Sequence, residues 1–205
     1  FGYVSQFSQR VDCLPNSLTQ LYFGSKFNQP VDNLPPNLTH LTFGIYSKFS
    51  HPVNNLPNTL TYLQFGDDFN LPVNNLPNQL THLKFGYKFN QPINCLPPNL
   101  IDLSFDYCFD FNQPVNCLPN KLINLCLSFD FNQPVNCLPK SLKKLEFGSN
   151  FNQPINCLPE NLTHLIFSIY SNFNQTINKL PDSLEEILIK DDSLLILFYE
   201  KYRNI

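Results

Sequence analysis

The chain has 205 residues, a net charge of −3 and only 14% charged residues. Proteins that bind nucleic acid present a basic stripe to the phosphates, so this charge argues against a nucleic-acid partner. A membrane-spanning helix needs about 18 consecutive apolar residues, and since the sequence has no such run we expect no membrane span.

One pattern recurs nine times along the chain, at intervals of 20 or 22 residues. The copies begin at Phe7, Phe27, Phe49, Phe69, Phe89, Phe111, Phe131, Phe151 and Phe173. We number repeat positions from this phenylalanine, which is position 0. Val or Ile stands at position 4, Leu-Pro at 7 and 8, Leu at 11, Leu or Ile at 14, and mostly Phe at 16. Such a period predicts a solenoid in which each repeat is one coil, and stacking buries what a single coil cannot.

Within each coil, positions 13 to 16 alternate polar and apolar residues, which predicts a short, half-buried strand. In the copy at residues 80–85, Leu83 and Phe85 should point inward, while His82 and Lys84 point outward. Strands of neighbouring coils should pair in parallel, about 4.8 Å apart. Prolines at positions 3 and 8 exclude helix from the return path. We expect the frequent glycine at position 17 to occupy a turn with unusual φ.

Four copies carry two extra residues after the strand, at 3–4, 45–46, 107–108 and 169–170. These insertions should bulge along one edge, either as plain loops or as a ridge that binds a partner.

Residues 1–7 match residues 43–49, so the chain should open on the last part of a further coil. After Ile189 the pattern stops, and Ser193 behind two aspartates predicts a helix over residues 194–202. We therefore expect a solenoid over residues 1–190 and a helical cap over 191–205.

The strand pattern L-x-x-L-x-F resembles that of leucine-rich repeats, and FNQPV or FNQPI followed by LP resembles the FNIP repeat. The resemblance implies a mainly β, right-handed, leucine-rich-repeat-like solenoid. FNIP-repeat proteins are typical of social amoebae and of giant viruses that infect amoebae, and many carry an F-box before the repeats. The resemblance thus implies a ubiquitin-ligase adaptor as one role, although the sequence contains no visible F-box.

Candidate chemistry is sparse in the repeats. Asparagine at position 1 in seven coils predicts a ladder of side-chain amides that satisfies loop backbone groups. Five of the seven cysteines share position 6, which we expect to be partly buried, with free thiols and neither disulfide nor metal. Unpaired cysteine spacing favours a reducing, cytoplasmic location, in a host cell or virion if the protein is viral. Histidines and cysteines form no repeating catalytic spacing, so we expect neither an enzyme nor a cofactor.

The outward positions 13 and 15 vary while their neighbours stay fixed, so stacking does not dictate them. We therefore predict a protein-interaction scaffold that binds a protein partner through the sheet face. The candidate partner-binding residues are Tyr62, His82, Lys84, Asp102 and Asn124.

Two other interpretations stay open. Either the outward residues serve only to contact solvent, or the chain is a structural component of a virion or filament. In the structural reading, an uncapped N-terminal coil allows end-to-end self-association. A threonine column at position 12 also hints at an ice- or carbohydrate-binding face, but other residues interrupt it, as at Ile101, Ile123, Lys143 and Glu185.

Overall fold

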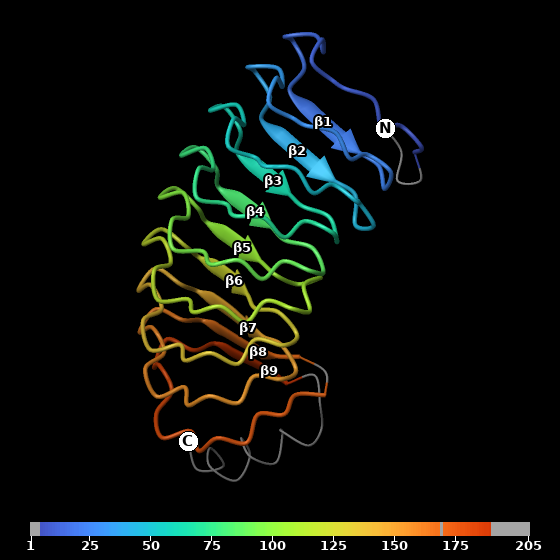
Figure 1. Ribbon diagram of the computed structural model, residues 1–205. Coiled ribbons are helices and arrows are strands. Elements are labelled where there is room, and N and C mark those ends of the chain that lie inside the picture. The colour runs from blue at the N-terminus through green and yellow to red at the C-terminus, as the bar shows by residue number, and fades with distance from the viewer. Residues whose placement is uncertain (1–4, 169, 190–205) are drawn as a thin grey trace.

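The computed structural model describes residues 5–168 and 170–189. These residues form a single nine-stranded sheet in which every strand pairs in parallel with the next along the chain (Figure 1). The strands are β1 (Gln20–Phe23), β2 (His40–Phe43), β3 (Tyr62–Gln64), β4 (His82–Lys84), β5 (Asp102–Ser104), β6 (Asn124–Cys126), β7 (Lys144–Phe147), β8 (His164–Phe167) and β9 (Glu186–Ile189).

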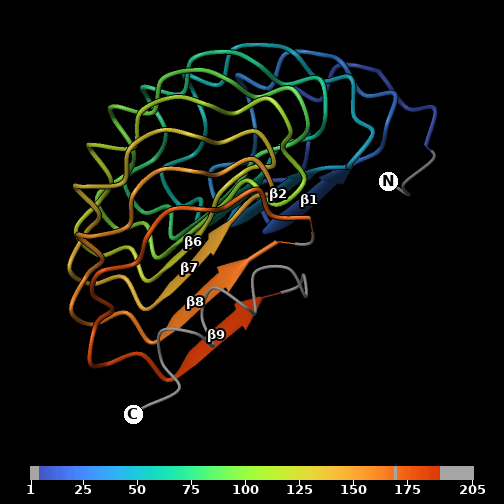
Figure 2. The same cartoon turned by 90° about the horizontal axis from the view of Figure 1, so that it is seen from below.

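The predicted solenoid and its strand positions are confirmed. Each strand begins at position 13, and equivalent positions pair in register, as in Tyr62 with His82 and Leu63 with Leu83. Seen from below, the sheet forms one wall and the rest of each coil arches around the core (Figure 2). No helix occurs in the part that the structure describes. The predicted cap at 191–205 lies outside the described residues.

The core is a stack of phenylalanine rings. Rings at position 0 stack on their equivalents in the next coil, with centroids 6.1–6.3 Å apart. Most also pack on the position 16 ring of the preceding coil, as Phe69 does on Phe65 at 3.8 Å, but Phe131 follows Leu127 and has no such ring partner there. Leucines at positions 11 and 14, such as Leu80 and Leu83, complete the core and are fully buried in most coils. Every core layer therefore has a neighbouring layer on each side, except at the ends.

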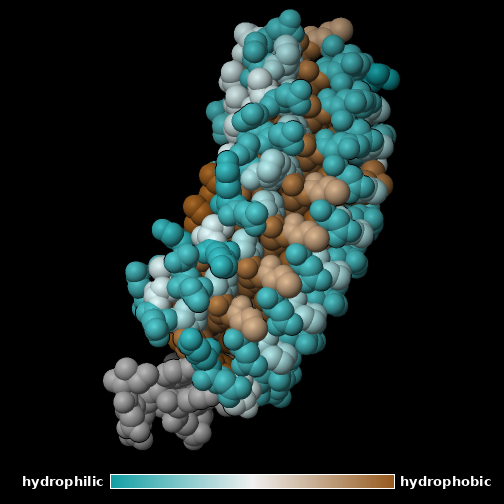
Figure 3. Space-filling model, turned by 90° about the vertical axis from the view of Figure 1, so that its left-hand side faces the viewer, coloured by the Kyte–Doolittle hydropathy of each residue, from teal (hydrophilic) through white to brown (hydrophobic). Residues whose placement is uncertain are grey.

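The solenoid is bent, because the coils are closer together at the sheet than across the core. Neighbouring strands lie about 4.8 Å apart, whereas the position 0 rings repeat at 6.1 Å or more. The coils therefore fan out away from the sheet, and the stack follows an arc (Figures 1 and 3). Figure 3 views the edge where loops lead into the strands, and an apolar stripe runs along that edge between polar margins.

The return path is held by one turn and one ladder. In every coil the amide of the position 11 leucine donates to the carbonyl of the position 8 proline, as from Leu80 to Pro77 at 3.1 Å. Asparagine at position 1 accepts the position 1 amide of the next coil, as Asn112 accepts from Asn132 at 2.9 Å. Asn112 also accepts from the side chain of Gln133 at 3.2 Å. The predicted asparagine ladder is confirmed.

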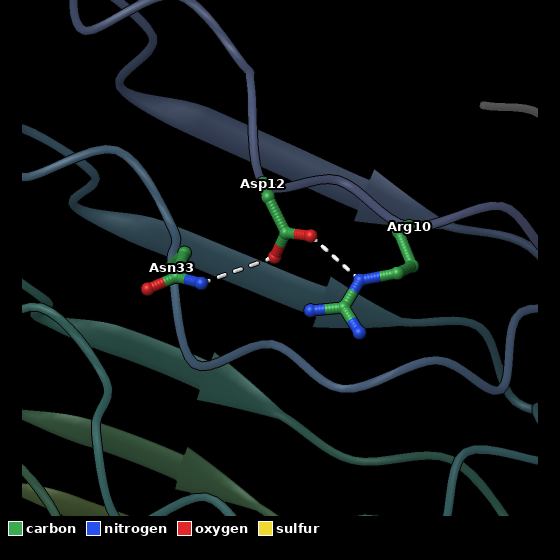
Figure 4. A network of polar contacts seen from close by, with 3 residues as sticks. All are labelled: Arg10, Asp12 and Asn33. Atoms are coloured by element: carbon green, nitrogen blue, oxygen red, sulfur yellow. Dashed lines mark hydrogen bonds and ion pairs between the residues drawn. The ribbon is translucent and has the colours of Figure 1, made fainter.

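Side chains at positions 5 and 6 form a second polar link between coils, shown for the first coils in Figure 4. Asn33 at position 6 donates to Asp12 at position 5 of the preceding coil, at 3.2 Å. Arg10 donates to the other oxygen of Asp12 at 2.6 Å. These two donors lower the pKa of the Asp12 carboxyl.

We expected the position 17 glycines to adopt an unusual φ, and this expectation was wrong. No glycine in the described residues has positive φ. Glycine occurs there because successive backbones approach each other closely. A Cβ on Gly86 would lie 2.3 Å from the carbonyl carbon and oxygen of Gly66. Such contact is far inside van der Waals range, so glycine is needed there for space and not for its dihedral freedom.

No helix among the described residues has the length and apolar character needed to cross a bilayer.

Substitution of Leu83, which points inward from its strand, tests whether this side chain belongs to the core. Leu83→Ala should lower the free energy of unfolding by about 2–5 kcal/mol in urea melts, because Leu83 is fully buried. The exposed neighbour Gln79 supplies the control, and Gln79→Ala should change stability by less than about 0.5 kcal/mol. Equal effects of the two substitutions would contradict the inward assignment.

Candidate functional site

The five predicted partner-binding residues lie together on the sheet face. Tyr62, His82, Asp102 and Asn124 begin the consecutive strands β3 to β6 and are paired in register. Lys84 ends β4, and like the other four it is half-buried. Parallel pairing places neighbouring side chains about 4.8 Å apart, so the first four form one continuous row and Lys84 lies beside it.

Threonine at position 12 fixes the orientation of the histidines. The Thr81 hydroxyl contacts the carbonyl of Thr61 at 3.0 Å. Nδ1 of His82 lies 2.9 Å from the same hydroxyl oxygen, and this contact holds the imidazole ring in place. The same arrangement recurs at Thr39–His40 and Thr163–His164.

Tyr62 is held between two histidines. Its ring centroid lies 5.7 Å from that of His40 and 6.1 Å from that of His82. Its hydroxyl donates to Oε1 of Gln64 at 3.0 Å. The side chain is therefore ordered by the sheet itself, with both its ring and its hydroxyl in defined places.

A hollow of about 330 Å³ opens on the sheet face over β4 to β7. It exists because Ser104 and Cys126 are small, whereas their neighbours at position 15 include Lys84 and Glu146. Three of the five predicted residues line it: Lys84, Asp102 and Asn124. The full lining is Lys84, Asp102, Leu103, Ser104, Asp106, Asn124, Leu125, Cys126, Lys144 and Glu146.

The hollow carries both signs of charge. Lys84 and Lys144 supply ammonium groups, and carboxylates line the space between and beside them. Asn124 donates to Oδ2 of Asp102 at 3.2 Å, which leaves that carboxylate able to accept further bonds. The arrangement suits recognition by hydrogen bonds and ion pairs. Among residues 5–168 and 170–189, no three His, Cys, Asp or Glu side chains are placed to hold a metal ion.

The thiols are free, as predicted, but position 6 is not partly buried. All five cysteines there are exposed: Cys13, Cys95, Cys117, Cys137 and Cys157. Cys108, in an insertion, is buried instead, and its sulfur contacts the carbonyl of Phe89 at 3.2 Å. Burial raises the pKa of the Cys108 thiol to about 12.

The insertions at 45–46 and 107–108 lie on the edge where the strands end, at the right in Figure 1. Tyr46, Tyr107 and Tyr170 are strongly exposed there, at 78%, 58% and 79%. On the same edge, sequence reasoning missed a row of three exposed rings. Tyr87, Phe109 and Phe129 stack on one another with centroids 4.7 and 5.0 Å apart. An alignment of the coils that removes the two-residue insertions would have placed all three in one column.

Alkylation can rank the thiols by exposure. Under native conditions without reductant, maleimide should modify the five position 6 cysteines first and Cys108 last, because only thiolates react and a buried thiol ionises poorly. Mass spectrometry of timed digests would give the order. Under denaturing, non-reducing conditions all seven should react, and incomplete reaction would indicate disulfides.

The raised pKa of Cys108 also predicts a pH dependence of stability. A free thiol ionises near pH 8.5 in the unfolded chain, whereas the native thiol ionises at about 12. The stability that Cys108 contributes is thus fully present below about pH 8.5 and is lost as the pH rises toward 12. Between pH 8.5 and 10.5, wild type should lose on the order of 2 kcal/mol more than Cys108→Ala in urea melts. Parallel losses in the two proteins would contradict this.

Comparison with known proteins shows which family the sequence matches. The family model described as FNIP Repeat matches residues 8–46, 49–88, 70–108, 111–150, 131–168 and 151–192. No curated protein sequence matches the chain.

Two solved structures are similar. CroV588, a giant-virus protein described as a novel circular LRR protein, aligns with TM-score 0.78 and 42% identity. That alignment covers 92% of this chain and 33% of CroV588, so the chain spans about a third of that protein's length. YopM from Yersinia enterocolitica WA-314 aligns with TM-score 0.56 and 21% identity over 88% of this chain and 48% of YopM, which shows the fold alone. Because the FNIP Repeat model matches most of its length, the chain belongs to the FNIP-repeat family.

Proposed function

We propose that the chain is a protein-interaction scaffold that binds a protein partner through its sheet face, around Tyr62, His82, Lys84, Asp102 and Asn124. The observation that carries the proposal is the in-register row of these side chains beside a charged hollow. Leucine-rich-repeat-like solenoids present such inner faces as extended binding surfaces.

Rigidity supports the proposal. Each candidate side chain stands on a strand that pairs on both sides, and buried leucines such as Leu83 and Leu103 lie directly beneath. Tyr62 and His82 are further ordered by ring contact and by the Thr81 hydroxyl. Little side-chain freedom is lost when a partner binds to groups that are already ordered, so more of the contact energy becomes affinity.

The chemistry of the face favours protein as the partner. Tyr62 offers an aromatic anchor of the type enriched in interface hot spots. His82 offers an imidazole ring whose Nδ1 is held by Thr81, and the hollow offers Lys84 and Asp102 to groups of either charge. This mixture of one ring, several amphipathic groups and both charges matches a protein surface better than a polyanion.

A finer version rests on the family resemblance. In it, the solenoid selects substrates for an F-box ubiquitin-ligase adaptor, with the F-box supplied by residues outside this sequence. The seven free thiols agree with a reducing compartment such as the cytoplasm.

A quantitative pull-down from host lysate tests the proposal, followed by calorimetry with each captured protein. Tyr62→Ala/His82→Ala/Lys84→Ala should weaken binding at least about tenfold, because truncated hot-spot residues commonly cost more than that factor. The matched control is Tyr46→Ala/Tyr107→Ala/Tyr170→Ala, which removes the exposed insertion tyrosines and should bind as wild type does. Thermal melts of both variants would verify that each remains folded.

The reverse pattern, in which only the tyrosine variant loses its partners, would move the site to the insertion edge. If wild type captures no protein and instead forms concentration-dependent assemblies in sedimentation, a structural role replaces the scaffold.

A further inference from the structure

The row Tyr87, Phe109 and Phe129, here called the aromatic ribbon, lies on a different surface from the sheet face. The three rings come from consecutive coils and stand where the strands have ended. Their backbones are linked directly, since the amide of Phe109 donates to the carbonyl of Tyr87 at 3.0 Å. Each ring is about two-fifths exposed, at 43%, 40% and 39%.

The fold does not require aromatic residues here. In the other coils the same column holds Ser25, Ser47, Asp67, Ser149 and Ser171. Ser47, Ser149 and Ser171 are buried, and the hydroxyl of Ser47 accepts the amide of Phe49 at 3.2 Å. A small residue thus fits inside the coil, whereas a ring is too large and is left partly in solvent. Three successive replacements place a rigid apolar strip on the surface without a packing need for it.

Carboxylates flank the ribbon. Asp110 and Asp130 directly follow the rings of Phe109 and Phe129, and both are exposed. Asp106 is exposed just before Tyr107, which is itself 58% exposed. Asp130 accepts from Asn150 at 2.6 Å, and a carboxylate can accept several bonds at once.

The cation on this part of the edge is already paired. Lys88, which directly follows the ring of Tyr87, contacts Asp68 at 2.6 Å. The aspartates beside Phe109 and Phe129 therefore give this edge a negative field next to exposed rings.

We propose that the aromatic ribbon, with Asp110 and Asp130, is a second docking surface that binds an arginine-rich segment of a protein partner. Arginine matches both features, because its aliphatic stem and planar guanidinium cover aromatic rings while its fork meets a carboxylate. The three rings extend over 4.7 and 5.0 Å steps. In an extended peptide, residues i and i+2 face the same way about 6.8 Å apart, so two arginines fit along the ribbon.

The test is an NMR titration of the ¹⁵N-labelled chain with a synthetic peptide of alternating arginine and glycine, at low and at physiological salt. Amide shifts should cluster at residues 87–88, 109–110 and 129–130. A matched lysine–glycine peptide should bind several-fold more weakly, because an ammonium neither stacks on rings nor forms a fork.

Four sets of variants complete the experiment. Phe109→Ser/Phe129→Ser installs the residue native to this column and should weaken binding at least about fivefold. Phe109→Leu/Phe129→Leu keeps apolar bulk, should fold like wild type, and should also weaken binding. Asp110→Asn/Asp130→Asn should weaken binding and reduce its salt dependence. Tyr46→Ser, an exposed ring off the ribbon, should bind like wild type.

The proposal is independent of the sheet-face function, and Tyr62→Ala/His82→Ala/Lys84→Ala should bind the peptide as wild type does. Shifts confined to the sheet face would overturn it. Equal binding of the arginine and lysine peptides with no effect of the ring variants would also overturn it, since charge alone would then suffice. A ribbon that binds no peptide but whose variants abolish self-association would instead be an interface between copies.

Discussion

The structure depends on stacking of the position 0 phenylalanines. Phe69 packs on Phe65 of the coil before it and lies between Phe49 and Phe89 in its own column. A lone coil would leave both faces of this ring in water, and the apolar area that it buries could not offset the cost of ordering some twenty residues. Stacking also sets the register, because a ring can face its equivalent only when the coils align position by position.

That register has a consequence for the surface. Once coils are aligned, every outward position becomes a column, whether or not its side chains contribute to stability. The threonines at position 12 and the asparagines at position 1 use their columns for coil-to-coil hydrogen bonds. Positions 13 and 15 vary from coil to coil, and their side chains lie side by side on a rigid base. The sheet face and the aromatic ribbon are both columns whose residue types the stacking leaves variable.

Much of this could be predicted from the sequence, because a fixed period converts local pattern into long-range pairing. Leu83 faces inward and Tyr62 pairs with His82, as repeat positions alone predicted. The five candidate residues were correctly placed on one face, although the hollow was not foreseen, since it arises from the joint smallness of Ser104 and Cys126.

The errors have physical reasons. Gly86 was misread because a sequence shows dihedral preference but not how closely one backbone approaches another. Position 6 was misread because a site that accepts both Asn and Cys was taken as enclosed, when both residue types are also tolerated in solvent. Phe109 was overlooked because an insertion shifts its count by two and hides its alignment with Tyr87 and Phe129.

The nearest-neighbour character of the stack also gives the molecule a mechanical property. Strands contact only the strands before and after them. A tension applied along the axis would therefore pass through the interfaces in series, and the weakest would yield first. Leu127 replaces the ring at position 16, so the interfaces on either side of it lack the ring pair that Phe85 and Phe105 make at 5.2 Å. Pulled from its ends, the stack should open beside Leu127 or at the last strand, where Ile189 also replaces the ring, and not between coils that share a ring pair.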